Sequence, residues 1–256
     1  MISGILEEMT LDDLRELAPN LALIPIGSTE PHGSALPYGT DTWQVSHVAR
    51  EATRRANQEG GRVVCLPTLP ISLNNNFRAF PFACRMQVPT FMALLKDLVS
   101  LCESEGVRRI VFLNGHGGNP DVIRAVQRDL AALDGIHTFL IHTTSCASEE
   151  ALAVWENQSD HAGEEETSQM LFLKPELVRK DKITNNPRHQ PSIPALKEFP
   201  VDFVRPWHLY LPKSAGGDAT RASAEKAEKV FASAITGTAK LLSELSMAPD
   251  SESFPY

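Results

Sequence analysis

Residues that could bind a metal ion are concentrated in three short segments of the sequence. They are Glu30, His32 and Asp41 in the first, His116 in the second, and His161 and Glu166 in the third. Imidazoles and carboxylates without thiolates form a mixed ligand set that suits zinc, manganese, iron, cobalt or nickel. Two carboxylates about 4 Å apart repel each other by ~4 kcal/mol at an effective dielectric constant of 20, and a bound cation is the simplest way to neutralise them.

Each of these residues also has a plainer structural interpretation. Asp41 could cap the helix that follows it, and Glu164–Glu166 could complement the positive end of a helix dipole. His32 or His116 taken alone is more often a hydrogen-bonded loop histidine than a ligand. The metal-centre hypothesis is favoured because Glu30, His32, Asp41 and His116 all occupy loops where strands are expected to end, which capping alone does not require.

Four short apolar runs predict strands that are buried on both faces. They are Leu21–Ile26, Arg62–Leu66, Arg108–Leu113 and Ile136–Ile141. Stretches with helical periodicity separate them, and Asn119 and Pro120 supply an N-cap and a first-turn proline for one of these helices. This alternation predicts a three-layer α/β/α fold with a mainly parallel central sheet.

The last third of the chain is less regular. Leu177–Ser214 contains six of the 18 prolines and predicts an irregular excursion over the surface. Thr220–Ser246 then has the apolar spacing of a long helix that closes the fold. Without an internal repeat or a linker, residues 1–256 are expected to form a single domain.

Composition excludes several classes of function. A net charge of -8 without a cluster of basic residues argues against nucleic-acid binding. The amino-terminal residues lack the features of a signal peptide, and no apolar run approaches the roughly 18 residues of a membrane span, so we expect a cytoplasmic protein with no membrane partner. The four cysteines are widely spaced without a CxxC pair, which predicts reduced thiols.

The motifs resemble those of the creatininase, or creatinine amidohydrolase, family of metal-dependent hydrolases. The resemblance extends over most of the chain. It is strongest in PIGSTEPHGSALPYGTD (Pro25–Asp41) and FLNGHGGN (Phe112–Asn119), and it continues in HAGEEETS (His161–Ser168) and GGDATRASAEKAEK (Gly216–Lys229).

The resemblance implies two divalent metal ions, zinc, manganese or iron, at the end of a parallel sheet. By position, Glu30 and His32 match ligands of different ions, Asp41 matches the carboxylate that bridges them, and His116 matches the second histidine ligand. Creatininase has a glutamate where this chain has Gly118, so we assign the fifth ligand to Glu166. The family often forms hexamers, which predicts a homo-oligomer.

The chemistry that this resemblance implies needs no protein nucleophile, because a bound metal ion can lower the pKa of water from 15.7 to about 7. His161 matches a histidine near the substrate and is the candidate proton donor to the leaving nitrogen. The backbone of Gly117 and Gly118 is expected to stabilise the oxyanion. Asn76 could donate a hydrogen bond to the substrate or belong to a turn, and Trp155 could line the pocket or pack a loop.

The expected substrate is a small cyclic or linear amide. The loop Ile71–Arg85 departs from the family's pattern near the substrate, so creatinine itself is not the inferred substrate. Two other classes remain open. A metal-dependent sugar isomerase or aldolase could use the same ligand set to stabilise an enediolate, and a noncatalytic metal-holding scaffold could share the fold.

Overall fold

The computed structural model describes residues 2–157, 161–251 and 254–256. Asp160, the residue directly before the third motif segment (His161–Ser168), lies outside the described residues. The description below is therefore limited to these three ranges.

The central sheet has four parallel strands in the order β2-β1-β3-β4. The strands are β1 (Leu21–Ile26), β2 (Val63–Cys65), β3 (Arg109–Asn114) and β4 (His137–His142). Each lies within one or two residues of the apolar run that predicted it. The register aligns Ile26 with Asn114 and Asn114 with His142, so three of the strands end level with one another.

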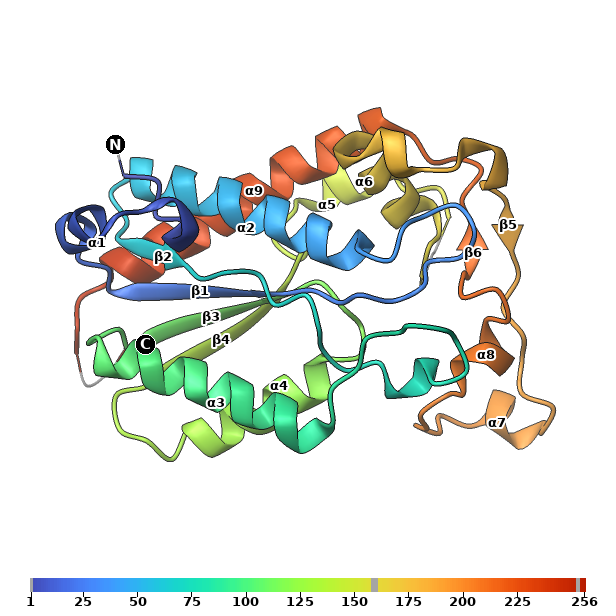
Figure 1. The fold of residues 1–256 in the computed structure, drawn as a ribbon, viewed down its shortest axis with the longest axis horizontal. Coiled ribbons are helices and arrows are strands. Elements are labelled where there is room, and N and C mark those ends of the chain that lie inside the picture. The colour runs from blue at the N-terminus through green and yellow to red at the C-terminus, as the bar shows by residue number, and fades with distance from the viewer. Residues whose placement is uncertain (1, 158–160, 252–253) are drawn as a thin grey trace.

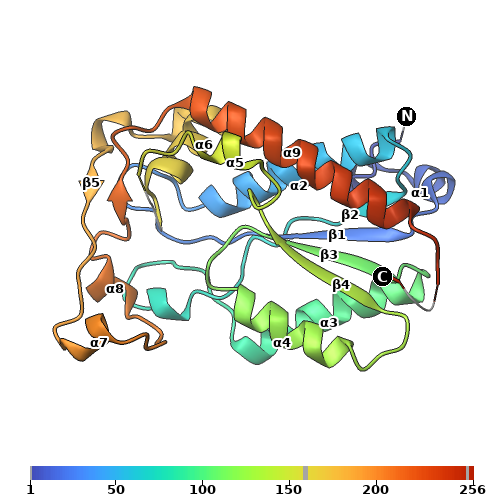
Figure 2. The ribbon, with the colours of Figure 1, turned by 180° about the vertical axis from the view of Figure 1, so that it is seen from behind.

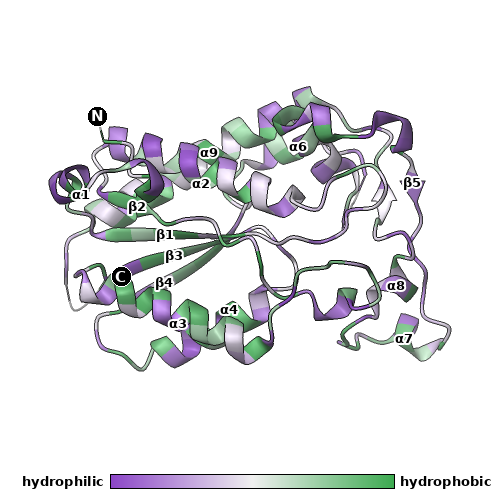
Figure 3. Cartoon of the chain, in the orientation of Figure 1, coloured by the Kyte–Doolittle hydropathy of each residue, from purple (hydrophilic) through white to green (hydrophobic). Residues whose placement is uncertain are grey.

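Helices cover both faces of this sheet, which confirms the three-layer α/β fold (Figures 1 and 2). One face packs against α2 (Thr40–Gln58) and α9 (Ala224–Met247), and the other packs against α3 (Val88–Ser104) and α4 (Pro120–Leu130). Successive side chains of β1 alternate between the two resulting cores, and all six of its residues are buried. The strands are accordingly hydrophobic along most of their length (Figure 3).

The remaining elements are short. The helices are α1 (Leu11–Leu17), α5 (Glu149–Leu152), α6 (Glu164–Leu173), α7 (Ala195–Glu198) and α8 (Trp207–Tyr210). β5 (Asn185–Asn186) pairs antiparallel with β6 (Gly217–Asp218). Single 3-10 turns occur at Leu6–Glu8, Asn75–Phe77, Pro175–Leu177 and Lys180–Lys182.

One helix start and one helix cap differ from the prediction because side chains have other partners. Thr220 bonds to the Asp218 carboxylate, so α9 begins at Ala224, where the Ser223 hydroxyl accepts a hydrogen bond from the Lys226 amide. Asn119 precedes α4 but does not cap it with its side chain. Its amide group instead donates to Asn114 Oδ1 at 3.0 Å.

The proline-rich excursion, with β5, α7 and α8, lies beyond the carboxyl ends of the strands (Figure 1). It therefore lies at the edge of the sheet where the motif loops emerge. Among the described residues, no helix combines the length and the apolar character that crossing a membrane requires.

Candidate metal centre

The loops after β1 and β3 bring three of the expected ligands into contact. Asp41 lies in the first turn of α2, and its two carboxylate oxygens face different imidazoles. Oδ1 is 2.8 Å from His32 Nε2, and Oδ2 is 3.1 Å from His116 Nδ1. The N-cap of α2 is Gly39 rather than Asp41, so the Asp41 carboxylate is available to the imidazoles.

The other two expected ligands complete the cluster from opposite sides. Glu30 Oε2 lies 3.1 Å from His116 Nδ1, and Glu166 Oε2 lies 3.5 Å from His32 Nε2. Two groups of three ligand atoms result, and each group fits within 4.8 Å. The two groups have one member in common, namely Asp41. The first group consists of Glu30, Asp41 and His116. The second consists of His32, Asp41 and Glu166.

The imidazoles are oriented as metal-binding histidines usually are, with one ring nitrogen fixed by a backbone oxygen and the other facing the carboxylates that would share the ion. His116 Nε2 is 2.9 Å from the Leu73 carbonyl oxygen, and His32 Nδ1 is 3.0 Å from the Glu30 carbonyl oxygen. His32 Nε2 is buried and has no hydrogen-bond partner in the described part of the chain, although Asp41 Oδ1 lies 2.8 Å away. An unpartnered nitrogen among buried carboxylates suits a divalent cation, so these residues fit a metal centre.

The electrostatics of the site show how strongly the charged groups interact. Burial lowers the pKa of His32, but the Asp41 and Glu166 carboxylates outweigh this effect and raise it to about 10. Burial and then the neighbouring carboxylates of Asp41 and Glu30 raise the pKa of Glu166 to about 7, against the opposing effect of His32. Such strong mutual perturbation within one cleft is typical of functional sites.

His161 lies beside the same cluster. Its Nε2 is 2.8 Å from the Pro31 carbonyl oxygen, so the ring donates there and leaves Nδ1 facing Glu30 Oε1 at 3.7 Å. Burial, followed by the charge of His32, holds the pKa of His161 well below its usual value. With Glu30 and His32 it forms a third group of possible ligand atoms. The geometry thus allows either a proton-transfer group or a ligand.

Glu166 is positioned by an unusual backbone conformation. Ala162 has a φ of 52°, in the left-handed region that non-glycine residues seldom adopt. Its N–H donates to Glu166 Oε2 at 2.6 Å. The two preceding glutamates serve other purposes: Glu164 pairs with Lys226 at 2.6 Å, and Glu165 accepts a hydrogen bond from Thr144 at 3.2 Å. Three adjacent glutamates therefore have three different environments.

A cavity of about 230 Å³ opens directly onto the cluster. Five of the six residues named above as possible metal ligands line it, all except His32, together with Asn76, Gly117 and Gly118, which we expected near the substrate. Trp155 does not line this cavity, and its buried indole nitrogen has no hydrogen-bond partner within the described ranges of the chain. The structure thus groups the predicted glycines and Asn76 with the candidate metal ligands and leaves Trp155 apart.

The aromatic wall of the cavity comes from residues that the sequence analysis missed. Phe77 and Trp207 have ring centroids 5.0 Å apart, and Arg205 also lines the cavity. Arg205 and Trp207 belong to the proline-rich excursion, whose sequence has no periodicity to place them. The local sequence signal for these two residues was weak: an arginine and a tryptophan on either side of Pro206.

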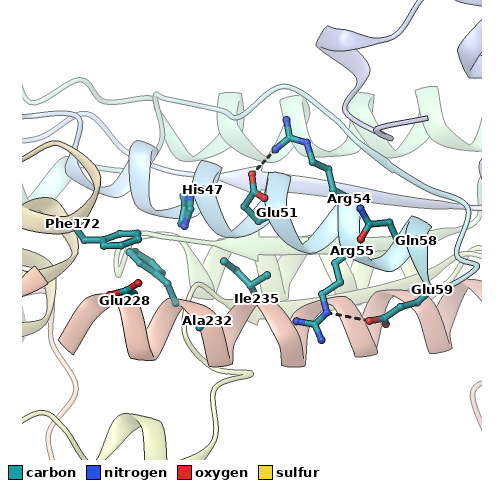
Figure 4. A pocket seen from close by; sticks show the side chains of 11 residues that line it. His47, Glu51, Arg54, Arg55, Gln58, Glu59, Phe172, Glu228, Ala232 and Ile235 are labelled. Atoms are coloured by element: carbon teal, nitrogen blue, oxygen red, sulfur yellow. Dashed lines mark hydrogen bonds and ion pairs between the residues drawn. The ribbon is translucent and has the colours of Figure 1, made fainter. Parts of the chain in front are cut away.

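A larger groove of about 610 Å³ lies elsewhere, between α2 and α9 (Figure 4). Two of its arginines are paired with glutamates of the same helix: Arg54 with Glu51, and Arg55 with Glu59 at 3.1 Å. Both arginines that line the groove are thus in ion pairs with glutamates. Among the described residues, none of the clusters of possible metal ligands lies in this groove. The smaller cavity is therefore the better candidate for a reaction site.

Comparison with known proteins agrees with the geometry. The model of the creatininase family, described as creatinine amidohydrolase, matches residues 7–242. The mycofactocin precursor peptide peptidase of Mycobacterium ulcerans (strain Agy99) is 28% identical over 260 residues, covering 97% of this chain and 94% of that protein.

Solved structures agree as well. A protein of Bacteroides fragilis NCTC 9343, described provisionally as a creatinine amidohydrolase, has a TM-score of 0.85 at 28% identity and covers 97% of this chain and 98% of its own. The structure described as "Creatininase Mn" has a TM-score of 0.75 at 22% identity, with 96% and 100% covered, and shares the fold.

Proposed function

Because this chain belongs to the creatininase family, we propose that it is a metal-dependent amidohydrolase that cleaves a C–N bond in a small cyclic or linear amide. The observation that carries the proposal is the position of Asp41, whose two oxygens face the imidazoles of His32 and His116. One carboxylate between two ligand groups is an arrangement that suits a pair of divalent ions.

The proposed ions are zinc, manganese or iron, held by Glu30, Asp41 and His116 on one side and by His32, Asp41 and Glu166 on the other. When bound, such ions supply an acidic water molecule and polarise a carbonyl group. Manganese in the structure described as "Creatininase Mn" supports a divalent ion of this kind.

The residues of this chain would supply positioning and proton transfer. Nδ1 of His161 is free to accept a proton and to return it to the leaving nitrogen, since Nε2 is committed to the Pro31 carbonyl. Gly117 and Gly118 line the cavity beside His116, and their N–H groups could stabilise the oxyanion. Asn76 lines the same cavity and could hold the amide.

The choice of an amide is supported by what two kinds of relative have in common. A peptide peptidase and a creatinine amidohydrolase both hydrolyse a C–N bond, the first in a linear substrate and the second in a cyclic one.

The test is a comparison of chelated and reconstituted protein on one substrate panel. Protein stripped with a chelator is reloaded with zinc, manganese or iron and assayed on lactams, cyclic ureides and dipeptides. We expect hydrolysis of at least one amide that disappears on chelation and returns with metal. Turnover of sugars instead would favour the isomerase or aldolase hypothesis, and tight metal binding without any turnover would favour the scaffold.

A further inference from the structure

One permanent cation lines the candidate active-site cavity. Arg205 is the only lysine or arginine among the described residues that line it. Its guanidinium lies over the Tyr210 ring, with Cζ 4.3 Å from the centroid, and it forms no ion pair with a carboxylate in the described part of the chain. Because stacking uses only the face of a guanidinium, its in-plane N–H groups stay available to an acceptor.

A second unsatisfied donor lies two residues further on. Trp207 lines the same cavity, and its buried Nε1–H has no hydrogen-bond partner among the residues that the structure describes. Its ring is held by packing, with centroids 5.0 Å from Phe77 and 5.6 Å from His161. A buried N–H without a partner is unfavourable, so an acceptor supplied by a ligand would be stabilised there.

A neighbouring cavity of about 180 Å³ has the opposite character. It shares Gly115, His116, Gly117 and Glu166 with the first cavity, and so it adjoins the same metal residues. No lysine or arginine of the described chain lines this second cavity. Besides Glu166, which both cavities share, it is lined by the carboxylate of Glu165. An anionic group is therefore disfavoured on that side of the centre and favoured on the side of Arg205.

From this asymmetry we propose that Arg205, assisted by Trp207 Nε1–H, binds a carboxylate of the substrate. A carboxylate only accepts hydrogen bonds, and both groups only donate them, so the two sets are complementary. The substrate class is then an acidic amide, such as an N-acyl amino acid or the carboxyl-terminal end of a peptide. This inference rests on the proposed amidohydrolase function and narrows its substrate.

The experiment measures binding rather than turnover. Zinc-loaded protein is titrated calorimetrically with N-acetylglycine and with N-acetylglycinamide, which differ only in the charged group. We expect the acid to bind about tenfold more tightly, as a charge-assisted hydrogen bond predicts. Arg205→Gln should reduce this preference to about twofold or less, Arg205→Lys should keep part of it, and Trp207→Phe should weaken it less than Arg205→Gln.

A matched control removes the same charge from the same segment. Lys197→Gln in α7 alters an exposed lysine that does not line the cavity, and it should leave the preference intact. The proposal is overturned if the wild-type protein binds both probes equally, if it binds neither at millimolar concentration, or if Arg205→Gln keeps the full preference. In the last case the carboxylate is held at the metal centre itself.

Failure of this inference can be separated from failure of the proposed function. An Arg205-dependent preference in a protein that hydrolyses no amide would contradict the function and leave the carboxylate site standing. Hydrolysis of amides with no dependence on Arg205 in either binding or KM would contradict the site alone.

Discussion

At the scale of the residue, Asp41 has the most demanding position in the site. Its side chain is buried, its two oxygens contact two buried imidazoles, and those imidazoles hold its pKa well below the usual range despite the opposing effect of burial. A carboxylate in this position cannot be replaced by a neighbour, since Glu30 and Glu166 lie on opposite sides of it.

Replacing Asp41 with Ala should therefore remove both metal ions. Each ligand group loses its shared member, and the remaining two ligands of each group are too few to retain an ion through gel filtration. Metal content measured by plasma mass spectrometry on wild-type and variant protein tests this. Retention of two equivalents of metal by the variant would show that Asp41 is not the bridge.

Replacing His161 with Ala should leave the metal content unchanged and slow turnover by about 10²- to 10⁴-fold, the usual contribution of a proton-transfer group. The reason is that His161 Nδ1 faces Glu30, whereas the two proposed ligand groups that share Asp41 each have three members without His161. Metal analysis and kcat are measured on the same preparation. A loss of metal would instead assign His161 as a ligand.

Metal uptake should also release protons. In metal-free protein the carboxylates around His32 raise its pKa to about 10 against the effect of burial, so this imidazole is protonated near neutrality and must lose its proton to coordinate an ion. At about pH 8 we expect at least one proton to be released per protein, and metal affinity should increase with pH up to about 10. A pH-indicator titration with zinc measures the release, and uptake with no proton released would contradict it.

At the scale of the element, α9 is held close to the turn that follows β4. Gly237 lies where the helix meets the backbone of Cys146, and a Cβ atom at this glycine would lie 2.0 Å from the Cys146 carbonyl oxygen. This close approach lets α9 cover α2 and the sheet at the same time.

Gly237→Ala should therefore destabilise the protein, although alanine is the better helix former by about 1 kcal/mol. We expect a loss of about 1–3 kcal/mol in the free energy of unfolding, because α9 or the turn must move. Urea denaturation measures it. Lys240→Ala, an exposed change on the same helix, is the control and should stay within about 0.5 kcal/mol of wild type.

At the scale of the whole molecule, the two ends of the chain are joined by buried contacts. Ser246 near the end of α9 bonds to Asn20 at 2.6 Å and accepts a hydrogen bond from the Arg62 amide at 2.8 Å. The core on this face of the sheet likewise draws on both Ile5 and Leu242. We therefore propose that residues 1–256 fold as one domain; the homo-oligomer implied by the family stays a prediction.

Metal-free protein should accordingly unfold in a single cooperative calorimetric transition. Chelation is required because ions that bind only the folded state would shift the midpoint with their concentration. Two separate heat-absorption peaks would contradict a single domain.

Much of the fold could be predicted because the relevant signals are local. A strand buried on both faces needs a continuous apolar run, and Leu21–Ile26 has one that matches β1 residue for residue. Because ligands follow strand ends in parallel sheets, Glu30, His32 and His116 could also be selected from the sequence.

Only the tertiary structure decided which aromatic and cationic groups reach the site. Trp155 and Trp207 are both unremarkable in sequence, yet Trp207 lines the cavity and Trp155 does not. Likewise, among Glu164, Glu165 and Glu166, only Glu166 joins the ligand cluster, through a turn at Ala162. Short-range periodicity records which face of an element is buried, whereas the path of an irregular segment depends on long-range packing that leaves no periodic trace in the sequence.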